Sequence, residues 1–351
     1  MQINSVLLKQ NTNIAFLSVG YVFNHKYHSL MRLFNCINLC LLTAFFMACT
    51  SDDLTNDQQE NFWENHEPFE LDYSVPFGIE STNLFSEEVD ARGESDLIEA
   101  SGIVSSVTNP GYLWAHEDKG NTNEIFLLDM QTGETVASYE LEGIFNRDWE
   151  DIEIGPGPVE GITYIYLGET GDNDRVYNGY EIYRFEEPVF EESHRGQKNP
   201  VSSEIETLKF RYPNMLKHDV ETLLLDPWTK DLFLVTKRSF FSIIYVLPYP
   251  QNTQSTAIAI KVGEFPFTRA VGGNISFDGR EMLVKTYDHV MFWQREASEN
   301  MVDMFMKTPK LAPYNPEPQG EAICFDHNGN YYTLSEFSNS IVPVLYFYQR
   351  L

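Results

Sequence analysis

The sequence predicts an all-β protein that folds as a five-bladed β-propeller. Aromatic residues make up 14% of the chain, and such residues favour pleated sheets. Short alternating runs are separated by turn sequences such as NPG, QTGE and DHNGN, with no long helical pattern between them. A unit of four predicted strands also recurs at intervals of 49, 71, 52 and 48 residues, and propeller blades typically repeat at roughly 40 to 50 residues.

Each repeat begins with a short motif of acidic or small residues that leads into an aliphatic strand. The five motifs are EASGI (99–103), DWEDI (148–152), DVETL (219–223), VGGNI (271–275) and QGEAI (319–323). A second strand ending in polar residues and a third strand rich in aromatic residues follow each motif. The predicted fourth strands are TVASYEL, IETLKFRY, AIAIKVGEF and, least clearly, MVDMFMKT. A charged insertion at 186–204 explains the long second interval.

The fifth repeat stops after its third strand. Its missing strand is expected from FELDYSVPF (69–77), which would close the ring and leave no long exposed sheet edge. Six blades are the alternative, if the stretch near 80–96 forms a degenerate unit. We predict that residues 69–351 form a single propeller domain.

The N-terminal region has the layout of a secretory signal. Residues 1–48 contain no Asp or Glu, and from Met31 one arginine precedes a short apolar run that ends at Cys49. Residues 1–30 are then an upstream extension, 31–48 the signal, and 49–68 a polar tether. FMAC resembles the lipobox of bacterial lipoproteins, and TSDD resembles an acidic surface-export tag. These resemblances imply lipidation of Cys49 and anchoring at the outer membrane surface of a Gram-negative bacterium.

The charge of the chain limits its partners. The formal net charge is −28, and all 52 acidic residues follow residue 48. Binding to nucleic acid draws on clustered lysine and arginine, so nucleic acid is not an expected partner. The acidity suits cations or cationic ligands, and a monomer is expected. Cys324 lies alone in the strand-like AICF and is predicted to be a buried structural thiol.

Aligning the repeats identifies a candidate axial ring. The equivalent positions are Ser101, Glu150, Glu221, Gly273 and Glu321. In a propeller the loops that enter the inner strands converge on one mouth, so three glutamates should face one axis. Asp148 and Asp219 stand two positions earlier and should support them, because residues two apart on a strand share a face. Asp151 and Glu153 are expected to face elsewhere, and Trp149 to pack between blades.

Two explanations of the acidic ring remain open. Several carboxylates aimed at one axis repel unless they are protonated, hydrated or neutralised. Calcium accepts loose geometries with many oxygen ligands and would neutralise them. Alternatively Lys237, Arg269 and Lys285, at the ends or starts of neighbouring strands, could form internal ion pairs. These three basic residues are also candidate ligand-binding residues.

Further polar residues are candidates for the same mouth. Glu169 and Glu336 end second strands, and Asp172 lies in the loop GETGDND; all three are candidate ligand-binding residues, with a solvated turn as the alternative for the GETGDND loop. His116 and His218 are candidate general bases, with ordinary hydrogen-bonded histidines as the alternative. GxSxG, P-loop, HExxH and CxxC motifs are absent, which argues against common serine hydrolases, phosphate-loop enzymes and zinc peptidases.

Three motifs support a family resemblance. NRDWEDIEIGPG, YIYLGETGDN and PQGEAICFDHNGNYYTLSE resemble motifs that recur together in secreted bacterial propellers, although Glu169 replaces their usual aspartate. More distantly, the chain is similar to esterase-like phytase and gluconolactonase-type propellers. That similarity implies an axial calcium that binds substrate, held here by Glu150, Glu221 and Glu321. Ser101 and Gly273 leave such a ring incomplete.

Three function hypotheses follow from these patterns. The favoured one is a surface-displayed binding module whose acidic mouth holds a cation and a polar ligand such as a glycan or a phosphorylated compound. The alternative is a calcium-dependent hydrolase of phosphoesters or lactones, with His116 or His218 as general base. A third hypothesis, a structural or assembly role in the cell envelope, predicts a mouth filled by protein side chains.

Overall fold

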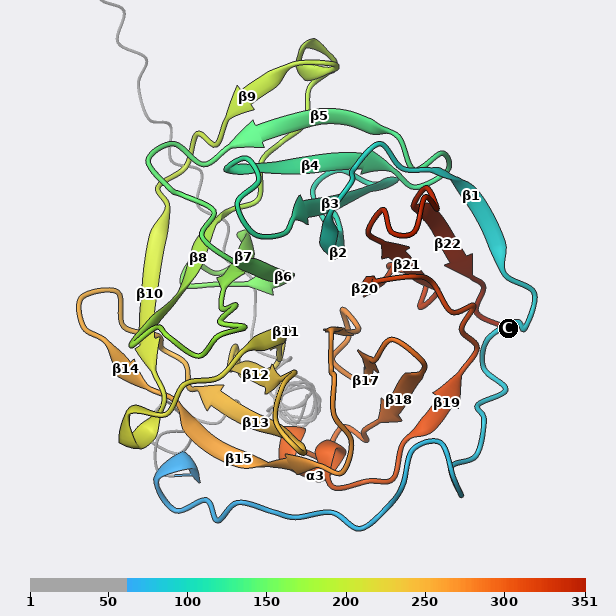
Figure 1. Cartoon of the computed structure of the whole chain (residues 1–351). Helices are drawn as coiled ribbons and strands as arrows, with labels where there is room; N and C mark the ends of the chain where they lie inside the picture. Colours follow the sequence, from blue (N-terminus) through green and yellow to red (C-terminus); the bar gives the residue numbers. More distant parts are fainter. Residues whose placement is uncertain (1–61) are drawn as a thin grey trace, which may run out of the picture. The chain divides into compact units, whose positions relative to one another are not determined.

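The predicted repeats form five sheets arranged in a ring (Figure 1). The computed structural model describes residues 62–351. Successive strands of each blade pair antiparallel from the centre outward, except for the outermost strand of each of the first two blades, which pairs parallel. Each inner strand starts at a repeat motif. The fold is therefore the predicted five-bladed β-propeller, and the described residues contain no sixth blade.

The first two blades each have five strands. Blade one contains β2 (Ala100–Ser105), β3 (Tyr112–Glu117), β4 (Glu124–Asp129), β5 (Thr135–Glu140) and β9 (Lys198–Pro200). Blade two contains β6 (Trp149–Pro156), β7 (Thr163–Glu169), β8 (Tyr180–Glu186), β10 (Glu206–Arg211) and β14 (Ala257–Ile258). Two short 3₁₀ helices, η1 (Glu192–His194) and η2 (Pro213–Met215), lie in the connections.

The other three blades each have four strands. Blade three contains β11 (Val220–Leu225), β12 (Leu232–Thr236), β13 (Ser242–Leu247) and β15 (Ile260–Phe265). Blade four contains β16 (Gly272–Ile275), β17 (Glu281–Lys285), β18 (Val290–Gln294) and β19 (Lys310–Ala312). Blade five contains β20 (Gly320–Phe325), β21 (Tyr331–Ser335), β22 (Val344–Tyr348) and β1 (Asp90–Glu94).

The strand that closes the ring is β1, so the prediction of residues 69–77 is wrong. β1 pairs antiparallel with β22. Phe69 instead forms a bridge to Gly263 on the outer strand of blade three. A β-carbon at Gly263 would come within 2.5 Å of the Phe69 ring. The missing side chain thus creates the space that directs Phe69 to blade three.

The prediction of MVDMFMKT as a strand is also wrong. Residues Met301–Phe305 form the helix α3, and β19 supplies the outer strand of blade four. The side chains of Asn300 and Asp303 form a capping box, which satisfies free N–H groups at the start of the helix. Met301, Met304 and Phe305 are buried at helical spacing. This short segment is therefore amphipathic with a helical period.

Four blades have an additional chain segment along their outer edge. The predicted insertion contributes β9, which pairs with β5 of blade one, and β14 pairs with β10 of blade two. Phe69 and Ser81 form bridges to the outer strands of blades three and four. An uncovered outer strand could pair with another chain, so these segments protect the sheet edges.

The packed domain begins before the predicted boundary at residue 69. Trp63 lies in a short helical turn and is only 5% exposed. Its indole Nε1 donates a hydrogen bond to Asp231 at 2.9 Å, and its ring packs edge-on against Phe233. The predicted extension and signal (1–48), the lipidation site Cys49 and most of the tether lie outside the described residues. Within residues 62–351, no helix is long and apolar enough to cross a membrane.

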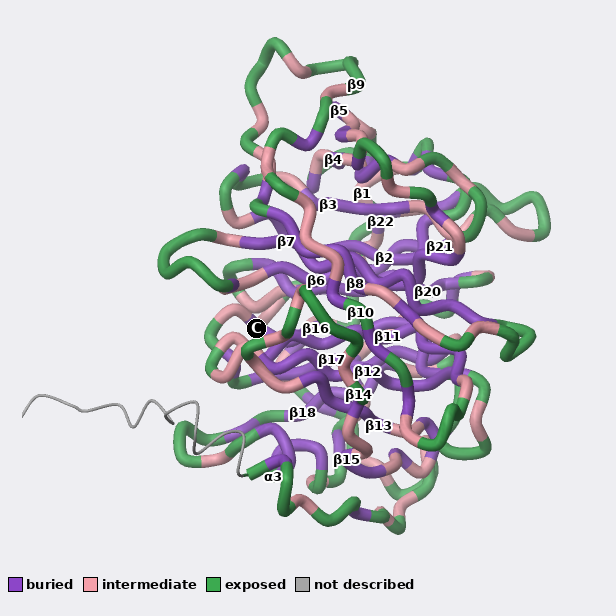
Figure 2. Tube along the Cα trace, turned by 90° about the vertical axis from the view of Figure 1, so that its left-hand side faces the viewer, coloured by how far each residue is buried: buried purple, intermediate pink, exposed green. Residues whose placement is uncertain are grey.

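The hydrophobic core lies between adjacent blades. Figure 2 shows the strands near the ring centre as buried and the connecting loops as largely exposed. Trp149 is fully buried in a cluster with Trp114 of blade one and Tyr183 of blade two. This confirms its predicted position between blades. Cys324 is also fully buried with no disulfide partner, as predicted.

Candidate metal centre

One end of the ring carries the acidic motifs, and we call this end the mouth. Loops that enter inner strands and loops that leave second strands meet there. In blades one, two, three and five, the register between the inner and second strands shifts at the motif. The residues skipped by these shifts are Ser101, Glu150, Asp151, Glu221 and Glu321. β16 of blade four pairs in continuous register.

These register shifts are β-bulges, and they explain why the aligned positions share a role. A bulge leaves a residue out of the pairing and redirects its side chain. Ser101 uses its redirected hydroxyl to donate a hydrogen bond to the carbonyl of Glu150 at 2.6 Å. Gly273, in the blade that lacks the bulge, stands against Thr222 and Leu224 of blade three. The acidic ring is therefore interrupted where the backbone is regular.

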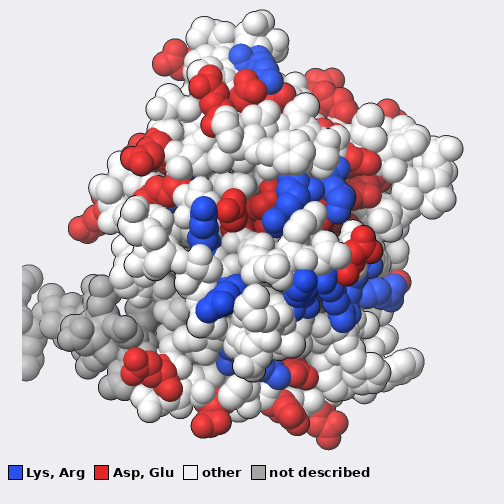
Figure 3. All heavy atoms as spheres, turned by 60° about the vertical axis from the view of Figure 1, so that its left-hand side comes forward, with Lys and Arg blue, Asp and Glu red and all other residues white. Residues whose placement is uncertain are grey.

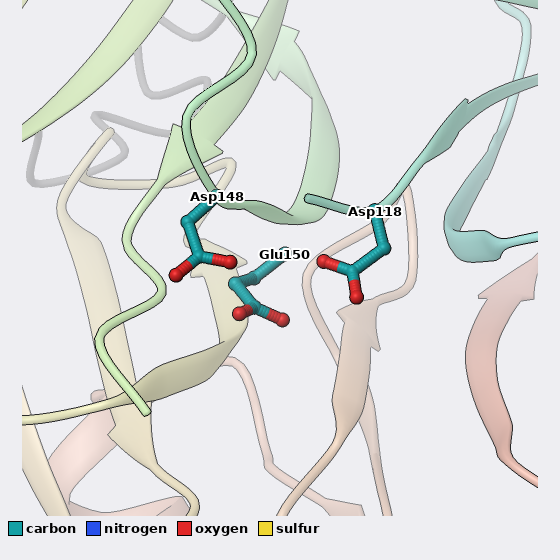
Figure 4. A group of neighbouring side chains, drawn as sticks. All are labelled: Asp118, Asp148 and Glu150. Atoms are coloured by element: carbon teal, nitrogen blue, oxygen red, sulfur yellow. The ribbon is translucent and has the colours of Figure 1, made fainter. Parts of the chain in front are cut away.

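Three carboxylates converge on one side of the mouth (Figure 4). Asp148 and Glu150 come from the start of blade two, and Asp118 from the turn after β3 of blade one. One ligand atom from each lies within 4.8 Å of the other two. Calcium binds oxygen at about 2.3 to 2.6 Å, so ligands on opposite sides of the ion are roughly 5 Å apart. The spacing fits one hard cation.

The carboxylates of this group have spare acceptor capacity. Asp148 is fully buried, yet its Oδ1 has no hydrogen-bond partner, and neither has Oδ1 of Asp118. Glu150 is 2% exposed and forms no ion pair within residues 62–351. Buried acceptors normally have partners, so these oxygens indicate room for a ligand.

Burial sets the protonation of the group. It raises the pKa of Asp118 to about 6, with backbone contact to Lys119 opposing it and the charges of Glu321 and Asp148 adding to it. Burial also raises the pKa of Asp148, against the hydrogen bond from Lys119. The pKa of Glu150 lies well above its usual value because of burial and the charge of Glu221. A bound cation would reverse these shifts by stabilising the charged forms.

A second group shares Glu150 but is already neutralised by the protein. Ligand atoms of Glu150, Asp219 and Glu221 also lie within 4.8 Å of one another. Lys237 forms an ion pair with Glu221, and Arg238 Nε lies 2.6 Å from Asp219 Oδ2. Although burial lowers it, the pKa of Lys237 is raised by Glu221 and Glu321. The ammonium therefore stays charged and occupies the place of a cation.

The predicted ring of three glutamates is thus divided. Glu321 lies 3.1 Å from Lys237 Nζ and accepts a hydrogen bond from the Tyr287 hydroxyl. It belongs to neither group of converging ligands. Internal ion pairing, one of the two explanations from the sequence, applies to Glu221 and Glu321. The cation stays a prediction for the side formed by Asp118, Asp148 and Glu150.

Glu169 and Asp172 hold the loops of the mouth in place. Glu169 accepts hydrogen bonds from the N–H groups of Arg147 and Asp148, at 3.0 and 2.7 Å. Asp172 is buried and accepts bonds from two N–H groups of its own loop and from the Tyr180 hydroxyl. The N–H of Asp172 in turn donates to Asp219 at 2.7 Å. These acids orient Asp148 and Asp219.

The two candidate histidines are packed against neighbouring groups. His116 is fully buried, and a β-carbon at Gly102 would lie 2.5 Å from its Nε2. His218 has its Nε2 3.0 Å from the Tyr245 hydroxyl and packs edge-on against Tyr212. Burial lowers the pKa of each histidine to about 4. Both are packed neutral side chains, so neither supports the predicted role of general base.

The remaining predicted ligand residues take different positions. Lys285 is fully buried and donates to the carbonyl of Gly320 at the start of β20; burial lowers its pKa to about 8. Arg269 is exposed at the rim, 2.8 Å from Asp288. Glu336 lies near Glu321 in the mouth, and burial with that charge raises its pKa to about 8.

Asp151 and Glu153 face inward below the mouth, contrary to their predicted orientation. Asp151 accepts a hydrogen bond from the N–H of Leu223 at 2.9 Å. Glu153 accepts one from the Asn274 amide at 3.0 Å, and Asn274 accepts one from the N–H of Phe325 at 2.9 Å. These contacts join blades two, three, four and five. The centre of the ring is therefore closed by polar side chains below Glu150.

Sequence reasoning missed Asp118 and Lys119. Lys119 Nζ lies 2.8 Å from Asp148 Oδ2. Both residues follow the second strand YLWAHE of blade one. Lys237 and Glu336, which the sequence identifies as candidates, follow the second strands of two other blades. Extending that comparison by one or two residues past Glu117 would have found them.

No protein-family model and no curated protein sequence matches the chain. Among solved structures, the Dos1 propeller is 13% identical with a TM-score of 0.32, covering 72% of this chain and 60% of its own. A Trichoderma reesei carbohydrate-active enzyme of family AA12 is 9% identical with a TM-score of 0.40, and the match covers 80% of this chain and 100% of the enzyme. A glucose dehydrogenase is 11% identical with a TM-score of 0.41, and the match covers 74% of this chain and 99% of the dehydrogenase. These likenesses concern the fold alone.

Proposed function

We propose that the protein is a cation-binding propeller, and that the cation lies between Asp118, Asp148 and Glu150. The observation that carries this proposal is the convergence of three largely buried carboxylates, two of which, Asp118 and Asp148, have an unpartnered oxygen atom. Oxygen-only ligands of this kind suit calcium, which accepts irregular coordination. The cation would offset the mutual repulsion of the acids.

The cation would present an open coordination position to a polar ligand at the mouth. Charged side chains of both signs surround it: Lys119 and Arg238 are half exposed, and Arg269 and Asp288 are exposed at the rim. On the face shown in Figure 3, lysine and arginine side chains lie between acidic groups. Such a rim suits a polar ligand such as a glycan or a phosphorylated compound.

Calorimetric titration with calcium at different pH values tests the cation site. Protonated carboxyls do not bind a metal, so affinity should fall as the pH drops through the pKa of Asp118, about 6. We expect binding at pH 7.5 and affinity weaker by about tenfold or more at pH 5. Absence of calcium-dependent heat at pH 7.5, together with no rise in thermal unfolding temperature, would contradict the proposal.

The alternative hypotheses gain less support. A calcium-dependent hydrolase needs a general base near the cation, and the two candidate histidines are packed against neighbouring groups. A purely structural role predicts a mouth filled by side chains, which describes the side occupied by Lys237 and Tyr287. The unpartnered oxygens of Asp118 and Asp148 favour the binding module.

We also propose that the chain is a lipoprotein anchored through Cys49 at the outer membrane surface. The support is the signal-like sequence from Met31 and the polar segment that follows Cys49. Expression of the full chain in a Gram-negative bacterium should place it in the detergent phase after Triton X-114 partitioning. The Cys49→Ala variant should move to the aqueous phase. Equal partitioning of the two proteins would rule out the anchor.

A further inference from the structure

Within residues 62–351, Lys119 is the one basic residue that forms an ion pair with the Asp118–Asp148–Glu150 group. Its Nζ lies 2.8 Å from Asp148 Oδ2, while Asp148 Oδ1 and Asp118 Oδ1 remain without partners. One ammonium therefore neutralises part of the group and leaves two buried acceptors unused. Lys119 is therefore a counter-ion of the group, but it leaves some of the carboxylate oxygens without hydrogen-bond partners.

The two lysines of the mouth are held very differently. The Lys237 side chain is 7% exposed and contacts both Glu221 and Glu321. The Lys119 side chain is 50% exposed and contacts one carboxylate. A long, flexible lysine with one partner and access to water can leave its contact more readily than a buried lysine that is held by two carboxylates.

The backbone beside Lys119 is fixed, so its side chain can move without moving Asp118. The Asn146 amide donates hydrogen bonds to the carbonyls of Glu117 and Asp118, at 3.0 and 2.9 Å. The Asn121 amide donates to the same Asp118 carbonyl at 3.0 Å. Asp118 is thereby held in position while the side chain of Lys119 extends inward from the exposed rim.

We propose that Lys119 is a built-in competitor for the cation site, which occupies Asp148 when no cation is bound and is displaced when one binds. This inference rests on the proposed cation site. It adds that displacement of Lys119 lowers the affinity of that site for the cation. Binding exchanges one Lys119–Asp148 contact for metal coordination by Asp118, Asp148 and Glu150. The affinity is then limited by the competition rather than by the ligands alone.

Calorimetry with calcium alone tests the competition by comparing the full chain with its Lys119→Gln variant. Removing the competitor should tighten calcium binding by at least about fivefold, the lower end of typical coupling between two linked binding events. Lys217→Gln is the matched control. Lys217 lies at the same end of the ring but contacts only the carbonyl of Val176, so its loss reports the general effect of one positive charge and should change affinity by less than about twofold.

A second measurement needs no substitution in the mouth. Calcium should free the Lys119 amine and increase its rate of acetylation severalfold, measured by mass spectrometry. Lys198 is the internal reference, because it is 48% exposed and pairs with acids on the outer edge of blade one. Its rate should not change.

The outcomes separate the competition from the cation site itself. If calcium binds the native chain and Lys119→Gln equally, or the variant more weakly, the competition is overturned and the site stands. If calcium binds neither protein, the cation site fails and the competition fails with it. Acetylation of Lys119 that is insensitive to bound calcium also overturns the competition.

Discussion

Replacing Glu150 by glutamine is expected to weaken calcium binding by roughly 100-fold, while the same change at Glu321 leaves it almost unaffected. Loss of groups behind the metal ligands typically lowers affinity by about 10- to 100-fold, and we propose Glu150 as a ligand itself. Glu150 belongs to both groups of converging carboxylates. Glu321 is bound to Lys237 and Tyr287 and would not contact the ion.

The contrast between the two variants is the informative result. Both substitutions remove one buried negative charge at equivalent positions of two blades, so a general electrostatic effect would act on both. Isothermal calorimetry at pH 7.5 measures the two affinities, and urea denaturation checks that both variants fold. Equal losses in the two variants would restore the ring of three glutamates predicted from the repeats. Unchanged affinity in Glu150→Gln would exclude the proposed centre.

Replacing Arg295 by methionine is expected to lower the free energy of unfolding by about 3 to 5 kcal/mol. Arg295 and Asp226 form a fully buried ion pair, with Nη2 and Oδ1 2.5 Å apart. Arg295 Nε also donates to the carbonyl of Gly279, and its guanidinium stacks 3.6 Å from the Trp228 ring centre. Removing the arginine leaves Asp226 as a buried charge without its counter-ion.

A nearby exposed pair provides the control for this prediction. Arg280 lies 4.0 Å from Asp278, and both side chains are at least half exposed. Arg280→Met should change stability by less than about 0.5 kcal/mol. The double variant Arg295→Met with Asp226→Leu should recover part of the loss, because it removes both buried charges. Chemical denaturation followed by tryptophan fluorescence measures all three, and a loss below about 1 kcal/mol in Arg295→Met would contradict the argument.

The blade pattern was readable from the sequence because it depends on local chemistry. The aliphatic positions Ile103, Ile152, Leu223, Ile275 and Ile323 all lie in inner strands. Alternating apolar residues specify strands, and the turn residues between them specify where each strand ends. Five copies of that local pattern were enough to predict the number of blades.

The closing strand was not readable because an edge strand needs little apolar burial. β1 has the sequence DARGE, which contains no large apolar residue. It pairs through its backbone with β22, and Arg92 lies over the Phe347 ring at 4.1 Å. A β-carbon at Gly93 would come within 1.9 Å of the Thr132 carbonyl oxygen. The contacts that make this segment a strand come from β22 and from Thr132 of blade one, both far from it in sequence.

The orientation of the acids in DWEDI could not be predicted from the sequence either. Alternation along a regular strand separates Glu150 from Asp151 by placing them on opposite faces. The bulge removes both residues from the pairing, so Glu150 reaches the mouth and Asp151 turns toward the inner strand of blade three. The bulge depends on the register with β7, which one strand alone does not contain.

By itself the sequence determined the fold class, the five repeats and the positions from which acids enter the mouth. These follow from the periodicity of apolar residues and from turn residues, which act over a few positions of the chain. The tertiary structure decided which acids meet one another, which are neutralised by Lys237, and that Asp118 and Lys119 join Asp148 and Glu150. Such choices depend on distances of a few ångströms between residues far apart in sequence, because charges and ligand atoms act only at short range inside a protein.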